Sequence, residues 1–196
     1  MPANIINIGY DSTNYYIIAG TPEAMLLVDC GWPGTMGRLK SRLKEKGVEL
    51  NQVQYLLATH FHPDHAGLTQ ELRNAGLKLI LMETQVPFVG SLKKIMKPNS
   101  GYVEIVVEGG FVLKCADSRA FLKELGIAGE ILPTPGHSPD SVSLILDEGI
   151  AFTGDLTHES MLSEDDVLAR ESWHQIRRRG ARIVYPAHGI LGTPEF

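Results

Sequence analysis

Three histidines and one aspartate lie within six consecutive positions of the sequence: His60, His62, Asp64 and His65. They directly follow the apolar segment at residues 53–58, which predicts a buried β-strand. Neutral imidazole and carboxylate groups are the ligands that zinc and its first-row neighbours prefer. Loops carried on the ends of rigid strands are a usual place for such groups. The segment therefore predicts a metal site.

The spacing of these residues predicts that they face two different cations. If the chain stays extended as it leaves the strand, residues two apart point the same way, so His60 and His62 face one cation together. Pro63 suits the first turn of a helix, because its φ is fixed near the helical value and its missing N–H is not needed there. We expect Asp64 and His65 to come out beside that turn and to face a second cation.

A site for two cations needs more donors than this segment supplies, and three candidates follow later in the chain. His137 lies in a loop rich in Pro and Gly. Asp155 ends a strand-like segment, and Gly154 before it allows a close approach of the backbone. His188 lies in another Pro/Gly loop. Because each follows a short apolar segment, all three can gather at one edge of the fold.

These residues, in this order, resemble the metallo-β-lactamase superfamily over nearly the whole chain. The family's signature is His-x-His-x-Asp-His, followed by a later His, a bridging Asp in a Gly-Asp pair and a last His before Gly. The resemblance implies that the first metal is held by His60, His62 and His137. It implies that the second metal is held by Asp64, His65 and His188, and that Asp155 bridges both. This complete ligand set is similar to that of the glyoxalase II-like and lactonase-like members.

An earlier strand end adds to the resemblance. Residues 26–31 read Leu-Leu-Val-Asp-Cys-Gly, similar to the family's Asp-x-Gly strand end. The resemblance implies that Asp29 supports the histidine loop from behind the metal ligands. On its local sequence alone, an ordinary turn-forming aspartate after a strand is an equally good interpretation.

The alternation of apolar segments with helical periodicity predicts an α/β or α+β fold. We expect strands in residues 5–19, 25–29, 53–58, 77–82, 130–133, 142–147, 150–153 and 182–185. We expect helices at 35–46, 66–75, within 85–96, at 118–125 and at 164–178, the last two capped by Asp117 and Ser163. Turns are expected at residues 20–23 and, in a hairpin over 102–115, at Gly109-Gly110. The four-layer αββα sandwich is what the resemblance implies.

The composition is that of a globular protein. A length of 196 residues predicts one domain over 1–196, with 43% hydrophobic and 21% charged residues. The net charge of −5 argues against a nucleic-acid partner. The cluster Arg177-Arg178-Arg179 is interpreted as a solvated helix end. No segment has the length of apolar sequence that spans a bilayer, so no membrane contact is expected.

The two cysteines and the N-terminus indicate the cell compartment. Cys30 and Cys115 are too few for a disulfide framework, and both are expected to be buried thiols. Residues 1–4 lack the charged and apolar regions of a secretory signal. We therefore expect a cytoplasmic protein that acts on a small-molecule substrate; the sequence leaves the oligomeric state open.

The expected chemistry is hydrolysis. A water molecule bound to a divalent metal can have its pKa lowered to roughly 7, which supplies hydroxide at neutral pH. We expect this hydroxide to attack the acyl carbon of an ester, thioester or lactone, with lactams as a further candidate. Asp64 would orient it. Two zinc ions are the expected cofactors, although iron and manganese also suit nitrogen and oxygen ligands.

Two other functions within the superfamily stay open. Mononuclear iron dioxygenases that act on persulfides use only the first-site histidines and the bridging Asp, so the complete second set favours the hydrolase. Phosphodiesterases share the ligands but usually add segments that grasp the substrate, and we find none in this sequence. The namesake β-lactamases carry Cys or Ser where this chain has Asp155.

Two further side chains are candidates for the substrate rim. Trp32 follows the Asp29 strand end, and His158 follows Asp155 closely. Packing is an equally good interpretation for Trp32. His174 is interpreted as an ordinary surface or packing residue, and neither histidine is assigned as a ligand.

Overall fold

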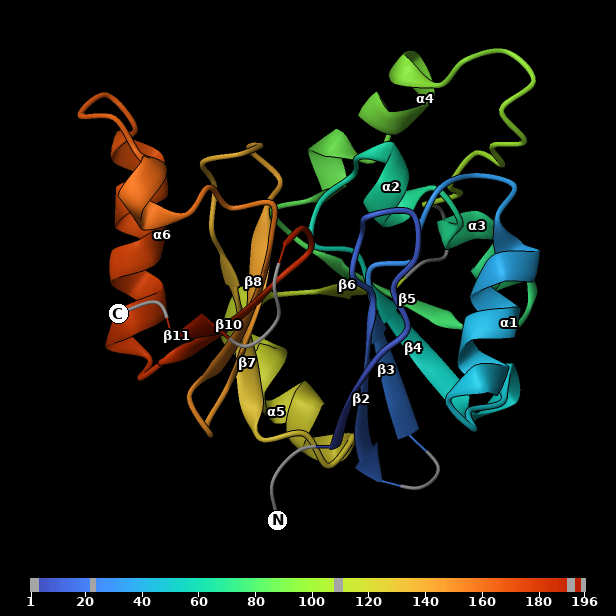
Figure 1. Ribbon diagram of the computed structural model, residues 1–196, viewed down its shortest axis with the longest axis horizontal. Coiled ribbons are helices and arrows are strands. Elements are labelled where there is room, and N and C mark those ends of the chain that lie inside the picture. Colours follow the sequence, from blue (N-terminus) through green and yellow to red (C-terminus); the bar gives the residue numbers. More distant parts are fainter. Residues whose placement is uncertain (1–3, 22–23, 108–110, 190–192, 195–196) are drawn as a thin grey trace.

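The computed structural model describes residues 4–21, 24–107, 111–189 and 193–194. Within these residues the strands form two sheets that face each other, and helices lie outside both sheets (Figure 1). This is the expected mixed α/β architecture with the layer order αββα. The expected turn at residues 20–23 lies partly outside the described residues, and the one at Gly109-Gly110 lies wholly outside them.

The first sheet is built from the N-terminal half. Its strand order is β1 (Asn4–Asn7), β2 (Tyr16–Thr21), β3 (Ala24–Val28), β4 (Val53–Leu57), β5 (Lys78–Met82) and β6 (Val112–Leu113). Strands β1 to β3 pair antiparallel, whereas β3 to β6 pair parallel. The carboxyl ends of parallel β3 and β4 therefore meet at one edge, where Asp29 N donates to Leu57 O at 2.9 Å.

The second sheet comes from the C-terminal half. Its order is β11 (Thr193–Pro194), β10 (Ile183–Pro186), β9 (Ile150–Gly154), β8 (Val142–Leu146) and β7 (Gly129–Pro133). Strands β9 and β10 are parallel, and the other pairs are antiparallel. Because β9 and β10 end at the same edge, the loops after them, which carry Asp155 and His188, lie together.

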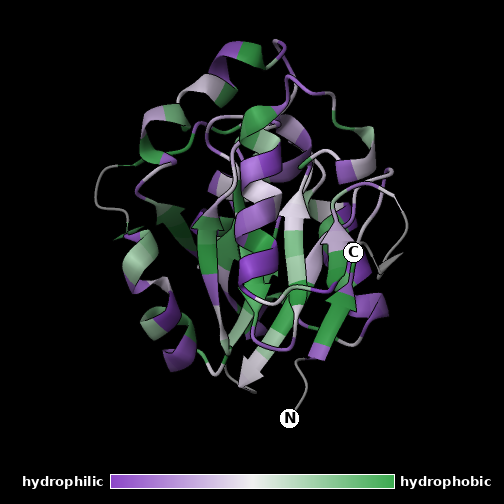
Figure 2. Cartoon of the chain, turned by 90° about the vertical axis from the view of Figure 1, so that its left-hand side faces the viewer, coloured by the Kyte–Doolittle hydropathy of each residue, from purple (hydrophilic) through white to green (hydrophobic). Residues whose placement is uncertain are grey.

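Most helices cover the outer faces of the sheets, whereas the helix at Ser118–Glu124 packs between the sheets, where its Leu122 joins the inter-sheet cluster. The helices are α1 (Met36–Glu45), α2 (Pro63–Ala66), α3 (Thr69–Asn74), α4 (Ser91–Ile95), α5 (Ser118–Glu124) and α6 (Val167–Arg178). The 3-10 turns are η1 (Leu50–Gln52), η2 (Val86–Phe88), η3 (Cys115–Asp117) and η4 (Glu159–Met161). Helix α6 lies over the second sheet with Trp173 and Ile176 buried, and its outward face is largely hydrophilic (Figure 2).

Three apolar clusters lie between the four layers. Alternation along a strand sends neighbouring side chains to different clusters. On β2, Ile17 packs under the outer helices, whereas Ile18 packs between the sheets. On β9, Phe152 packs between the sheets, whereas Ala151 packs against α6 with Trp173. The sheet edges that carry the predicted ligands are thus fixed by packing on both sides.

The helix expected over residues 66–75 is confirmed only in its second part, because the chain forms α2 and α3 with a break at Gly67 and Leu68. A Cβ on Gly67 would lie 2.3 Å from Pro63 O and 2.4 Å from Pro33 Cδ. Gly67 therefore lets the chain pass close to the loop after β3, and this tight packing accompanies the break between the two helices.

The hairpin expected over residues 102–115 is wrong. Residues 101–107 form no strand, and β6 pairs parallel with β5 instead. The backbone of Val106 bonds to side chains of α3: its N–H donates to Gln70 Oε1 at 3.0 Å, and its carbonyl accepts from Arg73. Side chains of a helix thus take the place of the neighbouring strand.

Some details of the helix ends and thiols differ from expectation. Helix α6 begins at Val167 rather than at residue 164, and Ser163 does not cap it; its N–H and hydroxyl both donate to the carboxylate of Asp166 at 2.7 Å. Asp117 occupies the N-cap position of α5 without a side-chain capping bond. Cys30 is buried as expected, but Cys115 is only partly buried.

We predict that Gly154→Ala destabilises the fold. Gly154 has a φ of +57°, and an added Cβ would lie 2.5 Å from Thr59 Oγ1. The strain and the displacement of Thr59 should lower the free energy of unfolding by about 1–3 kcal/mol, measured by urea denaturation. Gly37→Ala in α1, where a Cβ meets nothing within 4 Å, is the control and should be neutral or stabilising. Equal midpoints for the two variants would contradict the prediction.

Candidate metal centre

The seven predicted ligands lie together at the shared edge of the two sheets. They come from the loop after β4, helix α2, the loop between β7 and β8, and the segments after β9 and β10. The structure brings them into two groups, and within each group the possible ligand atoms lie within 4.8 Å of one another. One group is His60, His62, His137 and Asp155; the other is Asp64, His65 and His188.

In the first group, three imidazoles surround one oxygen of Asp155. His60 Nε2 lies 3.9 Å and His137 Nε2 lies 3.5 Å from Asp155 Oδ2. His137 Nε2 also lies 3.1 Å from His62 Nδ1. The rings of His60 and His62 are 4.4 Å apart between centroids, so the pair two residues apart shares one side as the spacing predicted.

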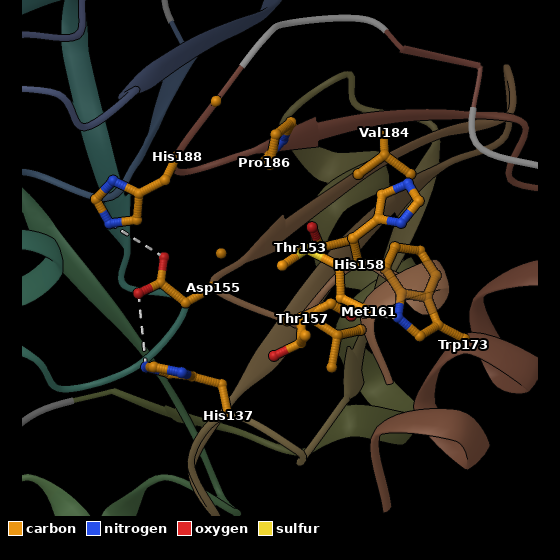
Figure 3. A pocket seen from close by; sticks show the side chains of 13 residues that line it. His137, Thr153, Asp155, Thr157, His158, Met161, Trp173, Val184, Pro186 and His188 are labelled. Atoms are coloured by element: carbon orange, nitrogen blue, oxygen red, sulfur yellow. Dashed lines mark hydrogen bonds and ion pairs between the residues drawn. The ribbon is translucent and has the colours of Figure 1, made fainter. Parts of the chain in front are cut away.

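In the second group, two imidazoles face the other oxygen of Asp155. His65 Nε2 and His188 Nε2 each lie 3.3 Å from Asp155 Oδ1. The same two nitrogens lie 3.4 Å and 3.2 Å from Asp64 Oδ2. Figure 3 shows His137 and His188 on opposite sides of Asp155. The carboxylate therefore offers one oxygen to each group, which is the arrangement a bridging ligand needs.

The donor atoms fit metal ions. His60 Nε2, His65 Nε2 and Asp155 Oδ1 are buried and have no hydrogen-bond partner within the described residues. Buried polar atoms are nearly always partnered, so a group of them pointing at one place needs an explanation. Imidazole nitrogen with carboxylate oxygen is a ligand set for zinc, iron or manganese. Two divalent cations would supply the missing partners.

The pKa values of the candidate ligands are shifted, because these residues are buried and lie close to other ionisable groups. Burial and the neighbouring imidazoles lower the pKa of His60 well below its usual value, which keeps it neutral as a ligand must be. Burial opposes the ionisation of Asp64, but its close contact with His65 and the attraction between their charges prevail and lower the pKa of Asp64 to about 2. Burial also opposes a charge on His65, yet the surrounding carboxylates, Asp29 first, raise its pKa.

Asp29 lies directly behind the second group. It is only 2% exposed, and its backbone has a left-handed φ of +60°. Its carboxylate accepts from Thr59 N at 2.7 Å and lies 2.9 Å from His65 Nδ1. A proton on that Nδ1 leaves Nε2 free to face the site. The contacts favour the supporting role implied by the resemblance over an ordinary turn.

The loop at residues 11–14 was not identified from the sequence. Ser12 O lies 2.8 Å from His188 Nδ1, and the Thr13 hydroxyl donates to Asp64 Oδ2 at 3.4 Å. Asn14 Nδ2 donates to Pro186 O at 3.1 Å and so holds the loop that carries His188. Asp11 and Ser12 both have positive φ. The only signal in the sequence was this pair of polar turn residues within the segment expected to be strand.

Two further buried residues that could not be identified from the sequence hold the histidine loop. Phe61 N donates to Asp140 Oδ2 at 2.7 Å, across the seam between the sheets. Gln85 Nε2 donates to Ala58 O at 2.9 Å and to Asp140 O at 3.2 Å. These bonds fix the loop after β4 against the loop that carries His137.

The other candidates have separate outcomes. Trp32 is 42% exposed and is not among the described residues that line the pocket beside the centre, so its place at a substrate rim stays a prediction. His158 lines a pocket beside the centre, whereas His174 is exposed on α6. In the basic cluster, Arg177 pairs with Glu159 and Arg179 pairs with Glu130. Among the described residues, no helix combines the length and apolar character needed to cross a membrane.

A family model described as the metallo-beta-lactamase superfamily matches residues 8–188, a span that includes all seven candidate ligands. The chain belongs to the metallo-beta-lactamase superfamily. Among its curated relatives, lactamase-like protein nscB of Trichophyton rubrum is 33% identical and the match covers 91% of this chain but 49% of that protein. A beta-lactamase-like protein 2 homolog of Caenorhabditis elegans is 31% identical, covering 90% and 56%. The chain thus spans about half the length of the curated relatives it matches.

Solved structures of metallo-beta-lactamase proteins share the fold. The metallo-beta-lactamase MIM-1 of Novosphingobium pentaromativorans superposes with a TM-score of 0.73 at 22% identity, covering 98% of this chain and 81% of that one. A metallo-beta-lactamase family protein of Thermus thermophilus gives 0.72 at 22% identity, covering 98% and 74%. At this identity the similarity shows the fold alone.

We predict that Asp29→Asn weakens the second group. Asn keeps the left-handed backbone available, but its amide can place a donor against His65 Nδ1 and so push the imidazole proton onto Nε2. The affinity for the more weakly held of two added metal ions should fall about 10–100-fold, measured by titration against a chelator. Asp117→Asn, at an exposed position without a capping bond, is the control. Unchanged affinity in Asp29→Asn would show that Asp29 does not orient the ligand.

Proposed function

We propose that this protein is a hydrolase with a dinuclear metal centre, and that a solvent-derived nucleophile attacks the acyl carbon of an ester, thioester or lactone. Membership of the metallo-beta-lactamase superfamily and the two groups of His and Asp side chains support a metal-dependent hydrolase. One observation carries the dinuclear proposal: the two carboxylate oxygens of Asp155 face different groups of ligands.

Each group of side chains has a defined part in this proposal. His60, His62 and His137 would hold one ion, and Asp64, His65 and His188 would hold the other. When bound, divalent metals in such a site act as Lewis acids and bring the pKa of water to roughly 7. Asp155 would keep the two groups at a fixed separation.

Asp64 is the residue we assign to proton handling. Its low pKa keeps the carboxylate ionised, and the Thr13 hydroxyl fixes one of its oxygens. An ionised, oriented carboxylate can hold a solvent molecule by accepting its hydrogen bond and can pass the proton to the leaving group. No serine or cysteine nucleophile is needed.

Charge distinguishes the acyl substrate from its alternatives. Among the described residues that line the pocket beside the centre there is no Lys or Arg. A nucleic-acid phosphodiester is bound chiefly through such cations, so an uncharged acyl substrate suits this surface better.

The second group, complete with Asp64, His65 and His188, favours the hydrolase over a persulfide dioxygenase that uses one iron. Zinc, a small-molecule substrate and a cytoplasmic location stay predictions of the sequence.

The test is a substrate screen with defined metal content. Protein loaded separately with zinc, iron and manganese is assayed on lactones, thioesters, β-lactams and phosphodiesters. We expect turnover of lactones or thioesters at two metal ions per chain, determined by elemental analysis, because both groups contribute to activation of the nucleophile. One iron or fewer per chain together with oxygen consumption on persulfides would contradict the hydrolase.

We further predict that Asp64→Ala removes most turnover while leaving the fold intact. Loss of an oriented proton acceptor and metal ligand should lower kcat by at least about 100-fold. Circular dichroism checks the fold, and elemental analysis reports whether the second metal is lost. Asp165→Ala, at an exposed position, is the control. A rate in Asp64→Ala equal to that of the control would refute the assigned role.

A further inference from the structure

A pocket of about 730 Å³ lies beside the metal centre. It is bounded by the ends of β9 and β10, by residues 156–161 and by Trp173 of α6, and it shares His137, Asp155 and His188 with the centre. Figure 3 shows these three side chains at one end of the pocket and Trp173 at the other. A group that fills the pocket would therefore lie next to the atoms that we assign to chemistry.

Most of the pocket wall is apolar. Its apolar side chains are Leu156, Met161, Trp173, Val184 and Pro186. The indole of Trp173 is buried and fixed, because its Nε1 donates to Thr157 O at 2.8 Å. Among the described lining residues, the only carboxylate is Asp155, which the metal centre uses. The wall thus suits an uncharged apolar group.

The position of the pocket follows from the packing of α6. Ala151 and Thr153 point to the α6 side of β9, whereas Phe152 points between the sheets. Near its start α6 is held close to the loop that carries His137, since a Cβ on Gly136 would lie 2.7 Å from Ala169 Cβ. Of the described residues of α6, Trp173 reaches the wall of the pocket.

One polar atom in the wall is unexplained by the fold. Thr153 is 2% exposed and lines the pocket, and its Oγ1 has no hydrogen-bond partner within the described residues. Leaving a buried hydroxyl unpaired costs about 1–3 kcal/mol. Its neighbour on the wall, Trp173, has its polar atom satisfied by the protein. A hydroxyl that is buried, unpaired and beside the centre is placed to bond to a bound molecule.

We infer that this pocket is the acyl subsite of the enzyme, and that it selects an apolar acyl group of medium length that carries one oxygen substituent. The inference rests on the proposed function and names its substrate class. The apolar wall would bury the carbon chain, and the Thr153 hydroxyl would bond to the substituent. The acyl carbon would lie at the end of the pocket that is formed by Asp155, His137 and His188.

The size of the acyl group is tested with thioesters that share one leaving group and differ only in their acyl chain, acetyl against octanoyl. Each buried methylene is worth about a fourfold gain, so kcat/KM should favour octanoyl by at least about 100-fold. Met161 lines the pocket yet is 76% exposed, so Met161→Trp can narrow the mouth without disturbing the core. This variant should reduce the preference for octanoyl over acetyl at least tenfold. Val167→Trp, on an exposed position outside the pocket wall, is the matched control.

The oxygen substituent is tested with Thr153→Val, which keeps the shape and removes the hydroxyl. Because Oγ1 is unpaired, the free protein should be as stable as the parent or more stable in thermal unfolding. Among 3-, 5- and 7-hydroxyoctanoyl thioesters, we expect at least one to be preferred over octanoyl by about tenfold in the parent. Thr153→Val should abolish that preference. A preference that survives in the variant, or none in the parent, overturns the role of Thr153.

The outcomes separate the pocket from the proposed function. Equal kcat/KM for acetyl and octanoyl thioesters overturns the acyl subsite but leaves the hydrolase standing. If no acyl substrate is turned over, the proposed function fails. Calorimetry with N-octanoyl ethanolamine, an amide without a thiol that could bind the metals, then tests the pocket by itself. Binding that weakens at least tenfold in Met161→Trp and not in Val167→Trp supports the pocket. Equal binding in all three proteins, or none in the parent, overturns it.

Discussion

The convergence of three carboxylates on one buried imidazole is the constraint on which the rest of the structure depends. Asp29, Asp64 and Asp155 all lie within 3.4 Å of a nitrogen of His65, in a place from which water is largely removed. Negative charges brought so close repel one another unless positive charge accompanies them. A proton on His65 offsets part of the charge, and bound divalent cations would offset more. The fold has to hold these groups together against their repulsion, and the donor atoms make the place a cation site.

The fold does this by fixing the groups at the seam between two sheets rather than on one element. The first sheet supplies the histidine loop and Asp29, and the second supplies Asp155 and the His188 loop. Hydrogen bonds across the seam join them. The Tyr16 hydroxyl donates to Pro186 O at 2.6 Å, and Val142 N donates to Thr59 O at 2.8 Å. Since packing on both faces of each sheet sets where the strands end, the core determines the separation of the two groups.

The sequence could predict the candidate ligands because they carry unusual side-chain chemistry at regular positions after strands. The same reasoning missed Ser12, whose contribution to His188 is a backbone carbonyl and therefore does not depend on its side-chain type. It missed Gln85 because a buried amide that bonds to backbone groups has no local pattern. It predicted a hairpin over 102–115 because apolar alternation cannot show that the side chains of α3 satisfy the backbone there. Local chemistry was thus predictable, whereas partners distant in the chain were not.

The two groups differ in how firmly the protein holds them. His65 is fully buried and backed by Asp29, whereas His188 is exposed and depends on the loop at residues 11–14. That loop belongs to the first sheet and reaches across the seam to a ligand carried by the second. Any loosening of the two sheets would therefore separate His188 from Asp64 before it disturbed His60, which lies in the buried loop after β4. Because a ligand that binds only the folded state stabilises it, a cation in the second group would in turn hold the sheets together. Site formation and sheet packing are thus coupled through one exposed histidine.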